Sequence, residues 1–375
     1  MTSFSREDRS VIGRWWWTVD RWTLLALILL TATGAVLIMA ASPGAANRIG
    51  LDPFHFVRNQ FVFLAPALLV MIAVSLLTPT GVRRLAVIGF GLAVVLMVAT
   101  LLVGVEVKGA SRWINLGGFT LQPSEFLKPC FAVVAAWMFS HARVEPTFPG
   151  RLIACVLFAL VVGLLILQPD FGMTMTVTAV WFVQFFLAGL SMALVAVALV
   201  LGLGLVTAAY AALPHVASRI DRFINPATGD TYQVDTSLRA FESGGLFGLG
   251  PGEGRVKSLL PDSHTDFIFA VAGEEFGILA CLLVVGLFAF IVLRGFSRVL
   301  KDANLFILLA VAGLLTQFGL QALINMGVAV RLLPAKGMTL PLVSYGGSSL
   351  VATAIGMGMV LALTRIDYLK QEPGR

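Results

Sequence analysis

Residues 256–277 read VKSLLPDSHTDFIFAVAGEEFG, and a long polar segment ends there as an apolar helix begins. Asp262, His264 and Asp266 lie at this junction, and two glutamates follow inside the apolar run. Ionisable groups in or beside a lipid-spanning segment are costly, so they indicate function by default. The stretch therefore predicts a membrane protein whose chemistry lies at the mouth of a membrane helix.

The composition agrees with a polytopic membrane protein. The 375 residues are 58% hydrophobic and only 12% charged, about half the charged fraction of a soluble protein, and the mean hydropathy is +0.92. The net charge of +6 comes mostly from loop lysines and arginines, and no basic motif indicates a nucleic-acid partner. All three cysteines lie in apolar segments, which favours small hydrophobic side chains over a disulfide or zinc framework.

The apolar pattern predicts an all-α fold with ten transmembrane helices. The first is about 20 residues long with no clear cleavage site behind it, so we expect it to be retained rather than removed as a signal peptide. The predicted spans are 22–41, 60–77, 84–104, 124–140, 152–167, 172–188, 191–211, 267–293, 303–327 and 342–364.

The distribution of positive charge predicts that both termini are cytoplasmic. With that orientation, 14 of the 26 Lys and Arg residues are cytoplasmic, and 5 of the other 12 lie in one long periplasmic loop, 212–266, which counts weakly. The predicted organisation is a cytoplasmic tail (1–21), a transmembrane domain (22–365) with the long loop between helices 7 and 8, and a second tail (366–375). No P-loop occurs, and the short cytoplasmic loops exclude an ATP site there.

The first outer cluster is residues 108–128. Glu125 and Lys128 are spaced i, i+3, so they share a helix face and can pair. One interpretation is an interfacial loop with a local ion pair. The other is a cavity wall whose cations, Lys108, Arg112 and Lys128, hold an anionic headgroup.

Two further outer clusters are short. In the tight turn 168–172, Asp170 is predicted to cap the next helix. The segment 325–349 carries two cations, Arg331 and Lys336, and ends in small residues that favour close helix packing.

The long loop 212–266 contains the remaining cluster. Val234, Leu238 and Phe241 have roughly helical spacing, which predicts a short amphipathic helix on the membrane surface. Six glycines follow within 244–254. No strand and helix frame them, which excludes a dinucleotide fingerprint, so they predict a mobile hinge or a flexible flap over a substrate cleft.

Asp266 is the favoured catalytic residue. A helix N-terminus stabilises its ionised form, which suits a general base for a hydroxyl group. Glu274 and Glu275 lie about 12–14 Å further along the helix, so we expect them to pair inside the bundle rather than share that proton. The spacing of His264 and Asp266 matches no standard zinc site. From the residues alone, an enzyme acting on a lipid-linked anionic substrate and a proton-coupled transporter both remain open.

Four motifs resemble the SEDS family (shape, elongation, division and sporulation) from about residue 22 to 365. They are RWINLGGFTLQPSEFLKP (112–129), LQPDFG (167–172), LPDSHTDFIFAVAGEEFG (260–277) and LPAKGMTLPLVSYGGSS (333–349). The lysine of the last motif, Lys336, resembles the cell-division branch, because the elongation branch usually has an apolar residue there.

The resemblance implies a peptidoglycan glycosyltransferase that polymerises lipid II at the periplasmic face of the bacterial inner membrane, at the division septum. The aspartate of the HTDF motif, Asp266 here, is essential in the family. The implied reaction joins the 4-hydroxyl of an acceptor GlcNAc to the anomeric carbon of a donor MurNAc, with inversion and loss of undecaprenyl diphosphate. A lipid II flippase and a non-catalytic divisome scaffold for the transpeptidase are the alternatives.

The implied site surrounds Asp266 with side chains that bind the diphosphate and sugars or orient the aspartate. These are Lys108, Arg112, Gln122, Glu125, Lys128, His264, Thr265, Arg331, Lys336 and Ser344. The implied partners are lipid II, membrane lipid, a class B penicillin-binding protein transpeptidase and other divisome membrane proteins. No cofactor or protein-bound metal is expected, and assistance by a divalent cation, Mg²⁺ or Mn²⁺, is an open alternative.

Overall fold

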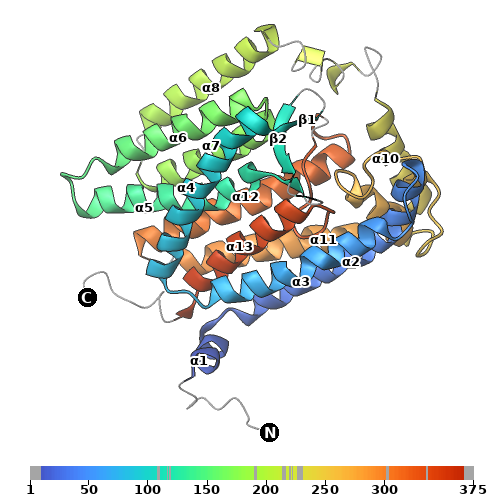
Figure 1. The fold of residues 1–375 in the computed structure, drawn as a ribbon, viewed down its shortest axis with the longest axis horizontal. Helices are drawn as coiled ribbons and strands as arrows, with labels where there is room; N and C mark the ends of the chain where they lie inside the picture. Colours follow the sequence, from blue (N-terminus) through green and yellow to red (C-terminus); the bar gives the residue numbers. More distant parts are fainter. Residues whose placement is uncertain are drawn as a thin grey trace.

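The computed structural model describes residues 10–366 except 108–109, 116, 118–119, 190–191, 213–216, 219–220, 222, 226–230, 301–303 and 335–336. The main helices are α1 (Val11–Thr18), α2 (Arg21–Arg48), α3 (His55–Ser75), α4 (Pro79–Val103), α5 (Pro123–Val144), α6 (Gly150–Leu167), α7 (Phe171–Leu187), α8 (Met192–Ala212), α10 (Tyr232–Gly244), α11 (Ile268–Val299), α12 (Leu305–Ala329) and α13 (Gly347–Leu363) (Figure 1).

Each of the ten predicted spans falls on one of these helices, α2–α8 and α11–α13. Among the described residues, six helices (α2, α3, α4, α6, α11 and α12) are long and apolar enough to cross a membrane, and α7 and α13 are shorter apolar helices. The protein is therefore a helical, multi-pass membrane protein.

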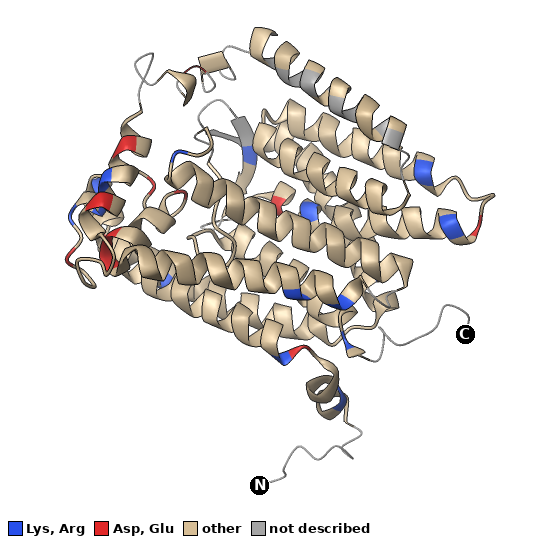
Figure 2. Ribbon diagram, turned by 180° about the vertical axis from the view of Figure 1, so that it is seen from behind, with Lys and Arg blue, Asp and Glu red and all other residues tan. Residues whose placement is uncertain are grey.

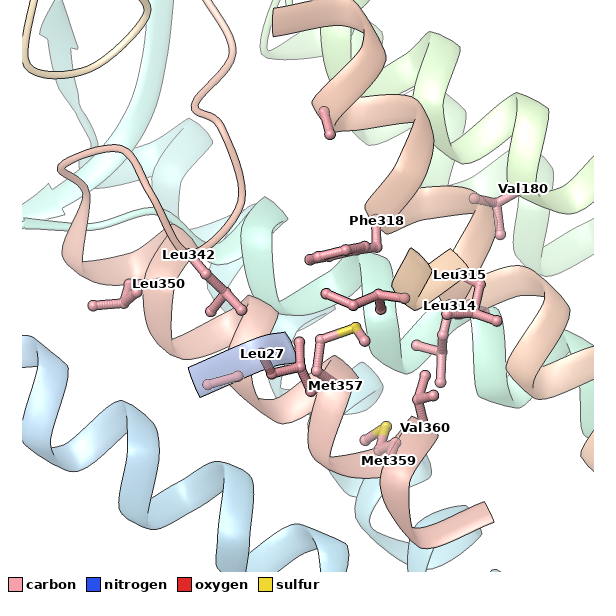
Figure 3. Close-up of a cluster of buried hydrophobic side chains, with 14 of the residues drawn as sticks. Leu27, Val180, Leu314, Leu315, Phe318, Leu342, Leu350, Met357, Met359 and Val360 are labelled. Atoms are coloured by element: carbon pink, nitrogen blue, oxygen red, sulfur yellow. The ribbon is translucent and has the colours of Figure 1, made fainter. Parts of the chain in front are cut away.

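Three helices form the interior of the bundle. In α12, 67% of the most apolar stretch is buried, against 28% in α3, α4, α6 and α11. α12 packs against α5 and α7, and α13 packs against α3 and α5. Figure 3 shows how Leu314 and Phe318 of α12 lie against Met357 of α13 within one buried cluster. The surrounding helices expose apolar faces, as expected for surfaces in contact with lipid.

One end of the bundle gathers both chain ends (Figure 1). Asp20, the N-cap of α2, accepts hydrogen bonds of 2.7 and 2.9 Å from Arg294, and Arg298 lies 3.4 Å from the same carboxylate. Burial alone would raise the pKa of Asp20, but these arginines and the Thr23 hydroxyl outweigh burial and hold the pKa below its usual value. Arg365 donates to Thr18 of α1 at 2.9 Å, so part of the predicted N-terminal tail is a helix attached to the bundle.

A small antiparallel sheet interrupts the helices between α4 and α5. It consists of β1 (Val105–Val107), β2 (Ala110–Asn115) and β3 (Thr120–Leu121), in that spatial order. The sequence analysis treats this stretch as a loop or cavity wall, because strands of two to six residues give too little alternation to be recognised. Gly117, with a φ of 66°, lies between β2 and β3.

The glycine-rich segment 244–254 is fixed to α11, so the expectation of a mobile hinge or flexible flap is wrong. The backbone amides of Leu249 and Gly250 each donate at 3.0 Å, to the carbonyls of Glu274 and Glu275 respectively. These bonds are possible because α11 is broken at Gly277 (φ 78°, ψ 179°). The break divides α11 into a short first part (268–276) and a longer second part (278–299).

The two glutamate side chains complete this attachment. Glu274 accepts hydrogen bonds of 2.7 Å from the backbone amides of both Val256 and Lys257. Glu275 accepts a 3.1 Å bond from the Gly252 amide and an ion-paired bond from the Lys257 ammonium. Both glutamates are buried, but their partners come from the loop rather than from neighbouring helices, as the sequence analysis expected.

A matched pair of glycine substitutions tests this close approach. Gly248 and Gly252 have similar φ values, 82° and 87°, but a Cβ at Gly248 would overlap the Glu275 carbonyl, whereas a Cβ at Gly252 would meet nothing within 4 Å. Both alanine variants bear the strain of positive φ, and Gly248→Ala adds overpacking. We expect Gly248→Ala to be less stable than Gly252→Ala by about 1–3 kcal/mol in detergent unfolding measurements. Equal losses would contradict the packing described.

Candidate active site around Asp266

Asp266 lies directly before Phe267, the N-cap of α11, so the predicted position at a helix N-terminus is confirmed. A tight turn holds it there. Asp262 adopts a φ of 54°, and its carbonyl accepts bonds from the amides of Thr265 (3.0 Å) and Phe267 (3.2 Å). Aspartate tolerates this left-handed conformation better than most residues. The turn therefore fixes the backbone of Asp266, whose side chain is half-buried.

The segment between α12 and α13 packs along this turn. The amide of Tyr345 donates to the carbonyl of His264 at 2.9 Å, and the hydroxyl of Ser344 donates to the carbonyl of Thr265 at 2.5 Å. The Ser344 hydroxyl also accepts a 2.8 Å bond from the Leu340 amide. Two motifs that are about 70 residues apart in the sequence thus form one structural unit, and the predicted site residues His264, Thr265 and Ser344 meet in it.

The carboxylate of Asp266 faces the same segment. An added Cβ at Gly337 would lie 3.0 Å from Asp266 Oδ2, so this glycine leaves room beside the carboxylate. Asn325 of α12 donates through its side-chain amide to the carbonyls of Asp266 (2.8 Å) and Met338 (2.6 Å). Asn325 therefore joins the two segments that flank the carboxylate.

A chain of buried polar groups extends from this region into the bundle. Lys128 pairs with Glu125 at 2.9 Å, as the i, i+3 spacing predicts, and both side chains are almost fully buried. The Lys128 ammonium also donates to the Gln321 side chain at 3.0 Å. Gln321 in turn donates to the Thr339 carbonyl at 3.0 Å, and the hydroxyls of Thr339 and Ser349 are 2.8 Å apart. The chain links α5, α12 and α13.

Sequence reasoning missed Gln321, Asn325, Thr339 and Ser349. A signal was available for the first two, because they are buried amides spaced i, i+4 in an otherwise apolar helix. A buried polar side chain needs hydrogen-bond partners, so such a pair predicts that α12 faces polar segments. Figure 2 shows that most charged residues lie toward the ends of the bundle and few lie in its middle.

A family model described as "Cell cycle protein", named for FtsW, RodA and SpoVE, matches residues 20–368. The chain belongs to this family, the SEDS proteins. A relative from Caulobacter vibrioides, "Probable peptidoglycan glycosyltransferase FtsW", is 43% identical over 97% of this chain and 93% of the relative. A protein of the same description from Trichlorobacter lovleyi is 34% identical over 91% of this chain and 92% of its own length.

Solved structures share the SEDS fold. A chain from a peptidoglycan synthase complex, solved to explain the structural coordination of polymerization and crosslinking, matches with a TM-score of 0.76 and 30% identity over 92% of this chain and 97% of that chain. The crystal structure of the rod shape determining protein RodA from Thermus thermophilus matches with a TM-score of 0.67 and 29% identity over 93% of this chain and 97% of that chain.

Two cations that the SEDS resemblance assigns to the substrate have protein partners instead. Arg112 donates to the carbonyls of Gln168 (3.0 Å) and Pro169, and it lies 3.5 Å from the Asp170 carboxylate. Asp170 also accepts from the Met173 amide at 3.2 Å, so its predicted capping role is confirmed. These contacts form because the α6–α7 turn presents its carbonyls beside β2.

Arg331 lies 3.6 Å from Asp235 of α10, an exposed pair that links the predicted amphipathic helix to the end of α12. Gln122 donates through its backbone amide to Ser348 at 3.1 Å and through its side chain to Ser124 at 3.2 Å. The remaining predicted cations, Lys108 and Lys336, lie outside the described residues.

His264 is placed in an aromatic cluster. Its ring stacks on Phe56 with a centroid distance of 4.0 Å, and Tyr345 lies 5.5 Å away. Burial lowers the pKa of His264 to about 4, although the charge of Asp262 acts in the opposite direction. The imidazole is therefore neutral at pH 7, so it supports Asp266 by packing rather than by charge.

This shifted pKa predicts a pH-dependent loss of stability. Because the folded protein disfavours protonated His264, its penalty is absent above pH 6.5 and grows as the pH falls toward 4. The penalty reaches on the order of 3 kcal/mol. We expect the thermal stability of wild type relative to His264→Phe, which keeps an aromatic ring, to decline between pH 6.5 and 4. A constant difference across that range would contradict the assigned pKa.

No group of three or more His, Cys, Asp or Glu side chains that could hold a metal ion occurs in the part of the chain that the structure describes. The His264 Nδ1 atom is buried and has no hydrogen-bond partner there, which is unlike a metal ligand held in position by a second partner. The side chains around Asp266 therefore do not fit a metal site built by the protein alone.

Proposed function

We propose that this SEDS protein is a peptidoglycan glycosyltransferase that polymerises lipid II into glycan strands at the periplasmic face of the inner membrane during septal wall synthesis. The observation that carries the proposal is the placement of Asp266. Its carboxylate is half-buried at a helix N-terminus, and its backbone is held by the α11 turn and by Asn325. The names of the relatives, and the match over nearly the whole chain, support the same activity.

Asp266 is proposed to act as the general base. It takes the proton from the 4-hydroxyl of the acceptor GlcNAc as that oxygen attacks the anomeric carbon of the donor MurNAc. The new β-1,4 bond forms with inversion, and the bond to undecaprenyl diphosphate breaks. The charge that develops on the diphosphate requires cations. Lys108 and Lys336 are the preferred candidates, because Arg112, Lys128 and Arg331 have carboxylate partners within the protein.

All ten helices are proposed to cross the inner membrane, with both termini in the cytoplasm. The shared position of the chain ends near Arg294 and Arg298 supports this, because positive charge favours the cytoplasmic side. In that orientation α10, the glycine-rich segment and the Asp266 turn are periplasmic. A class B penicillin-binding protein is the proposed partner, supported by the similar chain in a complex that couples polymerization to crosslinking. Other divisome membrane proteins are proposed partners from family membership alone.

The experiment is a reconstitution of purified protein with its transpeptidase partner and labelled lipid II. Glycan polymer that depends on this chain, detected by gel electrophoresis of the labelled product, is the expected result. Movement of lipid II across the vesicle membrane without polymer would favour the flippase alternative. Assembly of the complex with neither activity would favour the scaffold.

A further inference from the structure

The glycine-rich segment presents an apolar tip that the polymerase chemistry does not use. The side chains of Leu246, Phe247 and Leu249 are 60%, 79% and 47% exposed. They are consecutive around a turn whose glycines, Gly245 and Gly248, have φ values of 57° and 82°. Three large apolar side chains so close together on an exposed turn indicate contact with an apolar surface.

The tip cannot fold back to bury itself, because its backbone is attached to both parts of α11. The Leu249 amide donates to the Glu274 carbonyl at 3.0 Å on one side of the break. On the other side, the Ile278 and Leu279 amides donate to the carbonyls of Gly245 (3.0 Å) and Leu246 (3.3 Å). The turn is thus a rigid projection at the break in the helix.

The break lies about one bilayer thickness from the arginine cluster at the other end of α11. From Gly277 to Arg298 there are 21 residues, which span about 32 Å at 1.5 Å per residue, close to the roughly 30 Å of a hydrocarbon core. Arg298 lies beside Asp20, in the charged cluster near the chain ends. The apolar tip is therefore at the opposite boundary of the hydrocarbon, not far out in water.

The tip is also continuous with an apolar face of α11. Directly after the break, Leu279, Leu282 and Leu283 are 51%, 60% and 63% exposed. Such a face on a spanning helix contacts lipid, and the Leu246 carbonyl is bonded to its first turn.

We propose that the turn at 246–249 inserts into the outer leaflet, at the boundary between headgroups and acyl chains, as a fixed wedge. The ligand class is the lipid bilayer itself. The polar side of the same segment, with Glu253 and Arg255 exposed, remains in water. Because Glu274 and Glu275 connect the wedge to the Asp266 turn, the wedge sets the height of that turn above the lipid. The inference concerns membrane contact and does not depend on the proposed polymerase activity.

The test uses full-length protein in vesicles of phosphatidylethanolamine and phosphatidylglycerol. Phe247→Cys, in a background with Cys130, Cys155 and Cys281 replaced by alanine, is labelled with an environment-sensitive nitrobenzoxadiazole probe. Glu253→Cys is the matched control on the same segment. We expect a blue-shifted emission at position 247 and quenching by lipids with a shallow nitroxide that is several-fold stronger than at position 253.

Equal quenching at the two positions, or equal reaction of the two cysteines with a membrane-impermeant maleimide, would overturn the proposal. Shielding at position 247 that develops only after the transpeptidase is added would also overturn it, since the occupant would then be a protein. If Phe247→Cys does not fold, Leu249→Cys gives the same readout at the neighbouring exposed position.

Discussion

Replacing Asp266 by asparagine is expected to lower glycan polymerisation by about 10²–10⁴-fold, the usual contribution of a general base. Asparagine keeps the size of the side chain and the backbone bonds of the turn, including the Asn325 bond to the Asp266 carbonyl, but it cannot accept the hydroxyl proton. The measurement is the initial rate of polymer formation from labelled lipid II in the reconstituted complex. The thermal stability of the variant is expected to remain close to that of wild type.

Asp262→Asn is the matched control for this substitution. It removes a carboxylate four residues away in the same turn, and asparagine tolerates the positive φ at this position. Its rate is expected to stay within a few-fold of wild type. Robust polymerisation by Asp266→Asn would exclude the general-base role, and equal losses in both variants would indicate that the charge of the turn, rather than one proton acceptor, controls the rate.

Replacing Lys257 by methionine is expected to cause the largest loss of stability. The Lys257 and Glu275 side chains are 8% and 0% exposed, so the substitution leaves a buried carboxylate without its cation. Removing one partner of such a pair costs about 3–5 kcal/mol. The measurement is thermal unfolding in detergent, read by the loss of monodisperse protein. Polymerisation should fall as well, because the pair holds the segment that leads to the Asp266 turn.

The double variant Lys257→Met, Glu275→Gln is the informative comparison. Glutamine retains an oxygen that can accept the Gly252 bond and removes the unpaired charge, so most of the lost stability should return. Arg255→Met, at an exposed neighbour, should change the stability by no more than about 0.5 kcal/mol. A Lys257→Met variant as stable as Arg255→Met would show that the pair is not buried as described.

The sequence predicts the helices well, because long apolar runs have few alternatives in a membrane. It also predicts contacts made within one helix turn. The Glu125–Lys128 pair and the Asp170 cap are both confirmed, since each depends only on spacing along one element.

Contacts between distant segments could not be predicted in the same way. Arg112 meets Asp170 across more than 50 residues, so no local spacing identifies its partner. The glycine-rich segment has the composition of a mobile loop, and its attachment depends on two glutamates that follow it by about 25 residues. The amide pair Gln321 and Asn325 was visible in the sequence, but its partners were not.

The break at Gly277 changes what the periplasmic loop must supply. A membrane helix that starts anew at residue 278 has amide groups in its first turn with no carbonyl behind them, and an unbonded amide at the edge of the hydrocarbon costs several kcal/mol. Gly245 and Leu246 provide two of the missing acceptors. The loop is therefore part of the covalently distant start of that helix, and shortening it would leave a spanning segment without its cap. Tolerance of deletions, normally expected of glycine-rich loops, should end at these two carbonyls.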